Sequence, residues 1–200
     1  MKKKIIITIG RQFGSGGLAV AKELGRKLGI PVYDNELITK AAQDSGFSAE
    51  LFVRNDEKKS LFSFSRLFVE SESYMSENGL FQMQCETIRR IAEQGSAIIV
   101  GRCSDYVLRD MECTLDVFLT APMENRIARV MERAGVDMDK ATEIIEKRDR
   151  SRADYYNYYT FGNWGVASTY DLCVDSSLLG IEGTADFIID FAKRTGMTDE

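Results

Sequence analysis

The feature that most constrains the fold is a cluster of glycines that directly follows a short apolar segment. Residues 5–9 are apolar apart from Thr8, and four of the next eight residues, 10–17, are glycines. Glycine tolerates positive φ, so backbone N–H groups can turn toward an anion, and a following helix adds the positive end of its dipole. We name residues 10–17 the glycine loop and predict that it binds phosphate groups. The alternative is a tight turn without a ligand, although a turn needs fewer glycines.

Apolar runs of strand length alternate with helical patterns along the 200 residues. The expected strands cover residues 4–9, 30–33, 97–100, 115–119 and 170–174, and the expected helices cover residues 17–28, 35–44, 74–93, 122–133 and 181–193. Continuous apolar strands are typical of a parallel sheet covered by helices on both faces. The chain has two prolines and no low-complexity linker. We therefore predict one α/β domain over residues 1–200, with the three-layer P-loop NTPase fold and a five-stranded parallel sheet.

Two segments do not follow this core pattern. Residues 48–73 mix charged side chains with phenylalanines, and we expect a helical insert over the carboxyl edge of the sheet, within an acceptor-binding region of about residues 35–95. Residues 137–165 carry basic side chains followed by a tyrosine run, a composition that favours a lid. The tyrosines either stack on a nucleobase or pack the lid itself.

Composition excludes several other functions. The net charge of −5 argues against an extended nucleic-acid surface, which needs a basic excess. The apolar run near the N-terminus is too short for a membrane span or a secretory signal, so we expect a cytoplasmic protein without membrane association. The chain has no histidine, and its four cysteines lack CxxC spacing, which argues against a Cys/His zinc site and favours reduced thiols.

The glycine loop departs from the G-x-x-x-x-G-K-[ST] pattern at two positions. With Gly14-Ser15-Gly16 aligned, Gly17 stands where the phosphate-binding lysine belongs, and Leu18 stands where the magnesium-binding hydroxyl belongs. We assign these five residues to donor-phosphate binding. Arg11 at the loop entrance, or an arginine of the lid, is expected to supply the missing positive charge near the transferred group.

Beyond the loop, most of the chain outside about residues 45–95 resembles the cytidylate kinases, and more closely their divergent branch, the cytidylate kinase-like proteins. One matching segment is the apolar strand at 98–100 with Gly101-Arg102, and another is 117–122 with the arginines that follow. A third is the arginine-rich string 146–153, and a fourth is 171–177 with the closing helix. Tyr33-Asp34 with Lys40 adds a match in the N-terminal half.

The resemblance implies an ATP-dependent kinase that uses Mg²⁺ and phosphorylates a nucleoside monophosphate, CMP or dCMP first. It implies the following acceptor-binding residues: Asp34, Lys40, Arg102, Asp149 and Arg152. Arg148 and Arg150, in the expected lid, have the chemistry to stabilise transferred charge, because a guanidinium binds phosphate in bidentate fashion.

Each of these residues also has a simpler interpretation. An arginine of the lid can belong to a solvated helix face, and Asp34 can cap the helix that follows it. Cys103, beside Arg102, is expected to be a small buried apolar residue rather than a nucleophile.

The sequence also departs from the family near the expected metal site. Val100 replaces the acidic residue that precedes Gly-Arg in cytidylate kinases, and Asp34 and Asp105 are the substitutes we considered. The metal ligands are therefore left unassigned. Two other functions stay open: a kinase of another small metabolite, and a regulatory nucleotide-binding protein that has lost turnover. We expect small nucleotides as partners, and either a monomer or a homodimer.

Overall fold

A computed structural model describes residues 3–44 and 74–198. Along the chain the elements are β1 (Ile6–Arg11), α1 (Gly17–Leu28), β2 (Val32–Tyr33), α2 (Asn35–Asp44), α5 (Tyr74–Gln94), β3 (Ala97–Val100), α6 (Ser104–Val107), β4 (Thr114–Thr120), α7 (Met123–Ala134), α8 (Met138–Thr160), η1 (Ala167–Thr169), β5 (Leu172–Asp175) and α9 (Ser176–Arg194). The five strands form one sheet in the order β2-β3-β1-β4-β5, and every neighbouring pair is parallel. β1, which leads into the glycine loop, is the central strand.

Alternate residues of the central strand enter two different cores. Ile7 and Ile9 pack with residues of α1 and α9 on one face of the sheet. Ile6 packs with α2, α5 and α6 on the other face. Both faces are therefore covered by helices, as expected for parallel strands that are apolar throughout. This arrangement leaves the carboxyl ends of the strands as the exposed edge, where ligands bind in α/β sheets.

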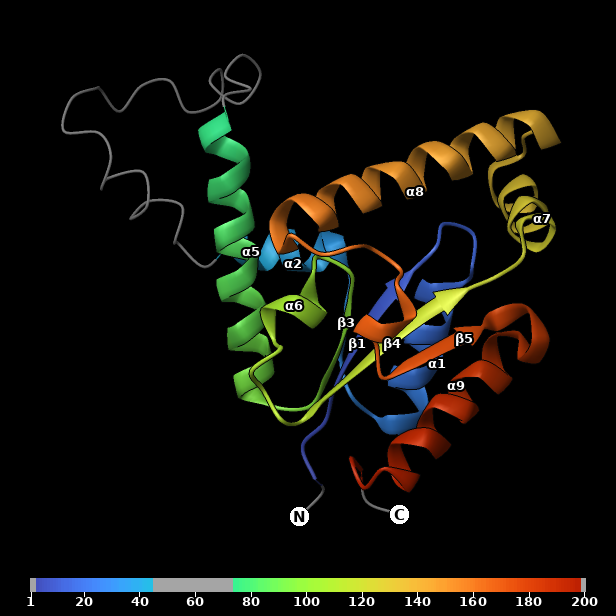
Figure 1. Cartoon of the computed structure of the whole chain (residues 1–200). Helices are drawn as coiled ribbons and strands as arrows, with labels where there is room; N and C mark the ends of the chain where they lie inside the picture. Colours follow the sequence, from blue (N-terminus) through green and yellow to red (C-terminus); the bar gives the residue numbers. More distant parts are fainter. Residues whose placement is uncertain (1–2, 45–73, 199–200) are drawn as a thin grey trace.

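A long helix crosses this edge. α8 extends over the carboxyl ends of the strands, from α7 to the neighbourhood of α2 and α5 (Figure 1). Its N-terminus is capped by Asp137, whose carboxylate accepts the backbone N–H of Lys140 at 2.8 Å. Ala141 and Ile145 anchor its first turns in a small core with Val130 of α7. The fold thus holds α8 directly above the glycine loop.

Every predicted strand and helix has a counterpart in the structure, with most ends within about two residues, and the short elements α6 and η1 were not predicted. Two differences are larger. The last helix begins at Ser176 rather than residue 181, because the structure includes a preceding turn that is interrupted at Gly180 (φ 66°). The region 137–165, for which we predicted a lid but no helix, is mostly occupied by α8. Residues 48–73, the expected helical insert, lie outside the described residues. Within the described part of the chain, no helix is both long and apolar enough to span a membrane.

Candidate active site

The glycine loop leaves β1 at Arg11 and enters α1 at Gly17. Gly14 and Gly16 adopt positive φ of 82° and 81°, conformations that side chains strongly disfavour. A Cβ on Gly14 would also lie 2.9 Å from the Cβ of Arg126. The first turn of α1 contains no acidic residue, so its N-terminus keeps its positive partial charge. The loop therefore has the backbone conformation and the helix end that an anion-binding turn requires.

Contacts to neighbouring strands and helices hold the loop in place. The backbone N–H of Gln12 donates to the carbonyl of Leu119 at 3.0 Å, and its Oε1 accepts the N–H of Ala121 at 3.3 Å. The buried Ser15 hydroxyl donates to the carbonyl of Gln12 at 2.9 Å, so it closes the turn from inside. The hydroxyl of Ser176, at the start of α9, donates to the carbonyl of Ser15. The loop is thus preorganised by the protein itself.

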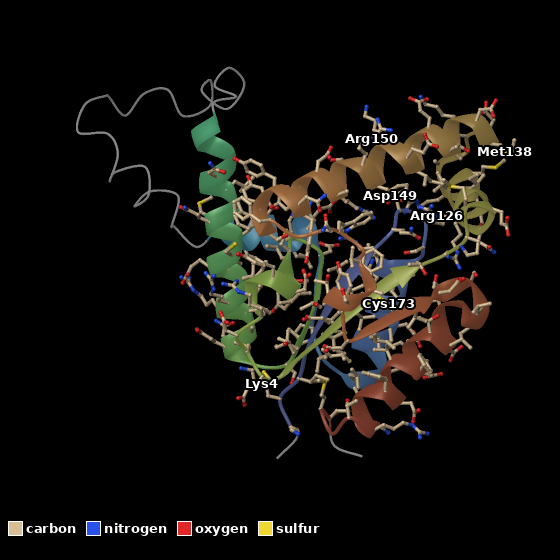
Figure 2. All side chains as sticks on the ribbon, viewed as in Figure 1. Lys4, Arg126, Met138, Asp149, Arg150 and Cys173 are labelled. Carbon is tan, nitrogen blue, oxygen red and sulfur yellow. The ribbon has the colours of Figure 1, made fainter. Side chains whose placement is uncertain are left out.

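α8 contributes a further restraint through Asp149. Its Oδ1 accepts the backbone N–H of Phe13 at 2.6 Å, and its Oδ2 pairs with Nη1 of Arg126 at 2.5 Å. Figure 2 shows Asp149 on the side of α8 that faces Arg126 and the sheet. Both side chains are largely buried, so this pair links α7, α8 and the glycine loop in a region with little solvent. The resemblance implied that Asp149 contacts the acceptor; here it contacts the loop.

Three arginines from three different elements meet beside the loop. The Arg11 side chain, from β1, reaches the turn after β3, where a Cβ on Gly101 would lie 2.9 Å from its Cζ. Arg102 follows in the same turn, with φ of 57°. Arg152 of α8 donates from Nη1 to the carbonyl of Arg11 at 3.0 Å. We name Arg11, Arg102 and Arg152 the arginine cluster.

The electrostatics of this cluster favour a bound anion. Burial, together with the charges of Arg152 and Arg102, lowers the pKa of Arg11 to about 9, although Asp34 acts in the opposite direction. Burial also lowers the pKa of Arg152, although Asp149 acts in the opposite direction. Because one site holds several cations that destabilise one another, an anion bound among them would relieve their repulsion.

The predicted acceptor side of the cluster is lined by α2, α5 and the C-terminal half of α8. Nε of Arg102 donates to Oδ1 of Asn35, and its Cζ lies 5.1 Å from the centroid of the Tyr155 ring. The Tyr155 hydroxyl donates to Oε1 of Gln84 at 3.1 Å, and the amide of Gln84 donates to the Thr39 hydroxyl at 3.2 Å. This hydrogen-bonded chain holds the Tyr155 ring beside Arg102, and Asn35 restrains the Arg102 side chain directly. The tyrosine run therefore supplies packing at this position, one of the two roles predicted for it.

The remaining predicted residues are less central. Asp34 caps α2 by accepting the N–H groups of Glu36 and Leu37, both at 3.1 Å, while its charge still acts on Arg11. Lys40 lies in α2. Leu18 is 39% exposed at the start of α1.

The two other lid arginines differ in their surroundings. Arg148 is exposed, yet its positive charge acts on Arg152. Arg150 lines a shallow groove on the opposite side of α8, with Glu146 and Asp154, and points away from the sheet (Figure 2). In this conformation Arg150 does not reach the glycine loop, because it lies one position after the inward-facing Asp149.

No metal site is evident in the part of the chain that the structure describes, where no group of three or more acidic or cysteine side chains could hold an ion. Asp105, one of the substitutes considered, is enclosed and accepts the Tyr156 hydroxyl at 2.7 Å. Burial raises its pKa, which disfavours the charged form that a metal ligand needs.

Sequence reasoning missed several residues that support the site. Gln12 anchors the loop to β4, and Asn35 and Gln84 orient the acceptor side. Gln12 follows Arg11 and Asn35 follows Asp34 in the sequence, so these two neighbours of predicted site residues could have been considered. Gln84 offered no signal, because its partners lie 45 and 71 residues away.

Known proteins share both the sequence pattern and the fold. The sequence model of the cytidylate kinase-like family matches residues 6–178. A cytidylate kinase of Methanopyrus kandleri is 28% identical over 183 residues, covering 86% of this chain and 85% of that protein. The crystal structure of an uncharacterized protein from Eubacterium ventriosum has a TM-score of 0.76 and 31% identity, covering 95% of this chain and 99% of that one.

A more distant structure supports the fold alone. A shikimate kinase from Bacteroides thetaiotaomicron is 15% identical, with a TM-score of 0.55 over 94% of this chain and 98% of that one. Together with the parallel sheet order β2-β3-β1-β4-β5, these matches confirm the predicted P-loop kinase fold and the family resemblance.

Proposed function

The chain belongs to the cytidylate kinase-like family, and we propose that it transfers a phosphoryl group from ATP to a nucleoside monophosphate, with CMP or dCMP as the preferred acceptor. The observation that carries this proposal is the arginine cluster beside the glycine loop at the carboxyl edge of the sheet. Phosphoryl transfer needs positioning and neutralisation of charge more than covalent chemistry. A chain without histidine is equipped for that task.

In the proposed complex the donor phosphates lie on the glycine loop. The backbone N–H groups near Gly14, Gly16 and Gly17, together with the N-terminus of α1, bind the oxygens. Because Leu18 offers no hydroxyl, a magnesium ion would come with the nucleotide phosphates, and it would supply charge neutralisation to the transferred group. Arg148 approaches the transferred group when the nucleotides are bound, and Arg150 requires a change in the position of α8 to do the same.

The acceptor monophosphate lies on the other side of the cluster, between Arg102 and Arg152. Arg102 binds the phosphate, and Arg152 contributes to both phosphate binding and recognition of the base, as the family resemblance implies. Asp34 and Lys40 complete this side from the start of α2. Asp149 acts on the acceptor by fixing α8 and the loop, since its carboxylate already binds Phe13 and Arg126.

A second candidate function is nucleotide binding without turnover. It is favoured by the three departures from an active kinase, Gly17, Leu18 and Val100. In that case ATP and CMP would each raise the melting temperature by mass action, but no ADP would form.

The decisive experiment measures ADP release with each common ribo- and deoxynucleoside monophosphate as acceptor. We expect CMP or dCMP to give the highest kcat/KM, and Arg102→Ala to lower it strongly. The matched control is Lys147→Ala, a cation from the outer groove of α8 with no assigned role, which should reduce turnover much less. Absence of ADP release with every monophosphate would refute the kinase proposal, and a preference for an acceptor that is not a nucleotide would favour a metabolite kinase.

A further inference from the structure

Two glycines border the side chain of Arg11 along its length. A Cβ on Gly17 would lie 2.8 Å from both Cβ and Cγ of Arg11, which is closer than real Cβ contacts. A Cβ on Gly101 would overlap the guanidinium of Arg11 and lie 2.9 Å from its Cζ. The stem of Arg11 therefore occupies the space above residue 17, and its charged end occupies the space above residue 101.

The backbone alone does not require a glycine at position 17. Of the glycines around Arg11, Gly14, Gly16 and Gly101 have positive φ, whereas Gly17 is the first residue of helix α1 and has no such conformation. Glycine lowers helix stability relative to alanine, so its presence inside the first turn needs another reason. The reason that the structure offers is the room taken by Arg11.

It follows that a lysine at position 17 and the observed position of Arg11 exclude each other. Every side chain other than glycine begins with a Cβ, which would collide with the Arg11 stem at 2.8 Å. The loop can hold its cation on residue 17, as the G-K-[ST] pattern does, or on residue 11, but not on both. This chain has Gly17 and Arg11.

The guanidinium of Arg11 is also free to bind a ligand. Within residues 3–44 and 74–198 it donates no hydrogen bond, although Arg102 and Arg152 both have protein partners. Its charged end lies beside Gly101, between the glycine loop and Arg102, and so between the proposed donor and acceptor phosphates.

We propose that Arg11 is the phosphate-binding cation that replaces the loop lysine, and that residue 17 is a glycine because it makes room for the Arg11 side chain. Gly101, whose positive φ already favours glycine, makes room for the guanidinium as well. The proposal rests on the proposed function only for the identity of the anion, a nucleotide phosphate. A guanidinium at this position can contact donor and acceptor oxygens together, because its planar fork presents several N–H donors.

A double-mutant cycle tests the steric part. Gly17→Ala should lower the melting temperature by about 3 °C or more, because the new Cβ displaces Arg11. In the Arg11→Gly background, which lacks both the Cβ and the Cγ of residue 11, the same substitution should cost nothing or raise the melting temperature, since alanine favours the helix. Gly79→Ala in α5, where a Cβ would meet nothing within 4 Å, is the matched control and should not destabilise. Equal effects of Gly17→Ala in the two backgrounds would overturn the proposal.

Binding of ATP tests the chemical part. Arg11→Ala should weaken ATP binding by roughly ten- to hundredfold, the range for losing a charge-assisted hydrogen bond. The double variant Arg11→Gly with Gly17→Lys moves the cation back to the helix, and it should recover most of the affinity that Arg11→Gly loses. Unchanged ATP affinity in Arg11→Ala would overturn the proposal. If ATP binds through Arg11 but no monophosphate yields ADP, the kinase proposal fails while the assignment of Arg11 stands.

Discussion

Removing the Asp149 carboxylate should destabilise the whole protein, and the size of the effect follows from its two contacts. Asp149→Ala leaves the N–H of Phe13 without its acceptor at 2.6 Å, and it leaves Arg126 without its partner at 2.5 Å. The Arg126 side chain is 9% exposed and that of Asp149 is 18% exposed, so water replaces these contacts poorly. Within the described part of the chain, Nε of Arg126 already has no hydrogen-bond partner.

Removing one partner of a buried ion pair lowers the free energy of unfolding by about 3 to 5 kcal/mol, and leaving a buried N–H without an acceptor lowers it by about 1 to 3 kcal/mol. Because part of Asp149 is exposed and water can enter the space it leaves, we expect a loss of about 3 kcal/mol in the free energy of unfolding. For a chain of this length that loss corresponds to a decrease of roughly 6 to 12 °C in melting temperature.

Urea denaturation and calorimetry of the unliganded protein measure this effect directly. Asp149→Asn keeps an oxygen for the Phe13 N–H but loses the charge, so it should cost about half as much. Arg150→Ala, on the opposite side of the same helix, should stay within about 0.5 kcal/mol of the wild type. A loss below about 1 kcal/mol for Asp149→Ala would refute the reasoning. Weaker CMP binding without loss of stability would instead support direct contact with the acceptor.

Three other outcomes are expected. Burial raises the pKa of Asp116 to about 6, so the stability that this residue contributes is present below about pH 4 and is lost as the pH rises through about 6. Urea denaturation at several pH values should show that Asp116→Asn reduces this loss of stability by roughly 1 to 2 kcal/mol. EDTA should abolish ADP release because magnesium binds through the nucleotide phosphates, and full turnover in EDTA would contradict this. Arg102→Ala should weaken the binding of every monophosphate by roughly 1.5 to 3 kcal/mol, whereas Arg152→Ala should weaken most the binding of the monophosphate with the preferred base. The opposite pattern in the acceptor KM values would exchange the two assignments.

The core of the fold was readable because buried parallel strands carry continuous apolar runs. The strand at 97–100 was predicted with the observed bounds, and β1 extends to Arg11, two residues beyond the predicted end. The apolar run ends at Ile9, but the backbone keeps pairing with β4 through Arg11. Hydrophobicity therefore located the strands, while the last residues of β1 depended on pairing that no local pattern shows.

The helix above the site was not readable in the same way. Its inward side presents Ile145, Asp149, Arg152 and Tyr156 at helical spacing, a mixture of apolar and charged side chains. A helix is recognised in a sequence by a continuous apolar stripe, and this mixed face does not form one, so the sequence did not predict the helix. The polar residues face inward because their partners are the glycine loop, Arg126 and Asp105.

Individual residues of the site were predicted by type, but their partners were not. The sequence drew attention to Asp149 as a carboxylate within an arginine-rich string, yet its contact with Phe13 spans 136 positions. It also showed that Gly17 lacks the lysine and suggested Arg11 as the substitute. Only the structure shows that the Arg11 side chain occupies the space that a Cβ on residue 17 would need.

Different residues set the shape of the loop and its charge, which would allow the proposed site to bind phosphate without the lysine. The carbonyl groups of the loop are bound by Arg126, Arg129 and Ser176, which stabilise its shape without using its anion-binding side. Asp149 adds a restraint from above through the N–H of Phe13. The shape of the loop therefore depends on residues outside the G-K-[ST] pattern, and its charge can come from any cation that reaches it. Because shape and charge are supplied separately, moving the cation from residue 17 to residue 11 changes where the phosphates are contacted, and leaves the loop itself intact.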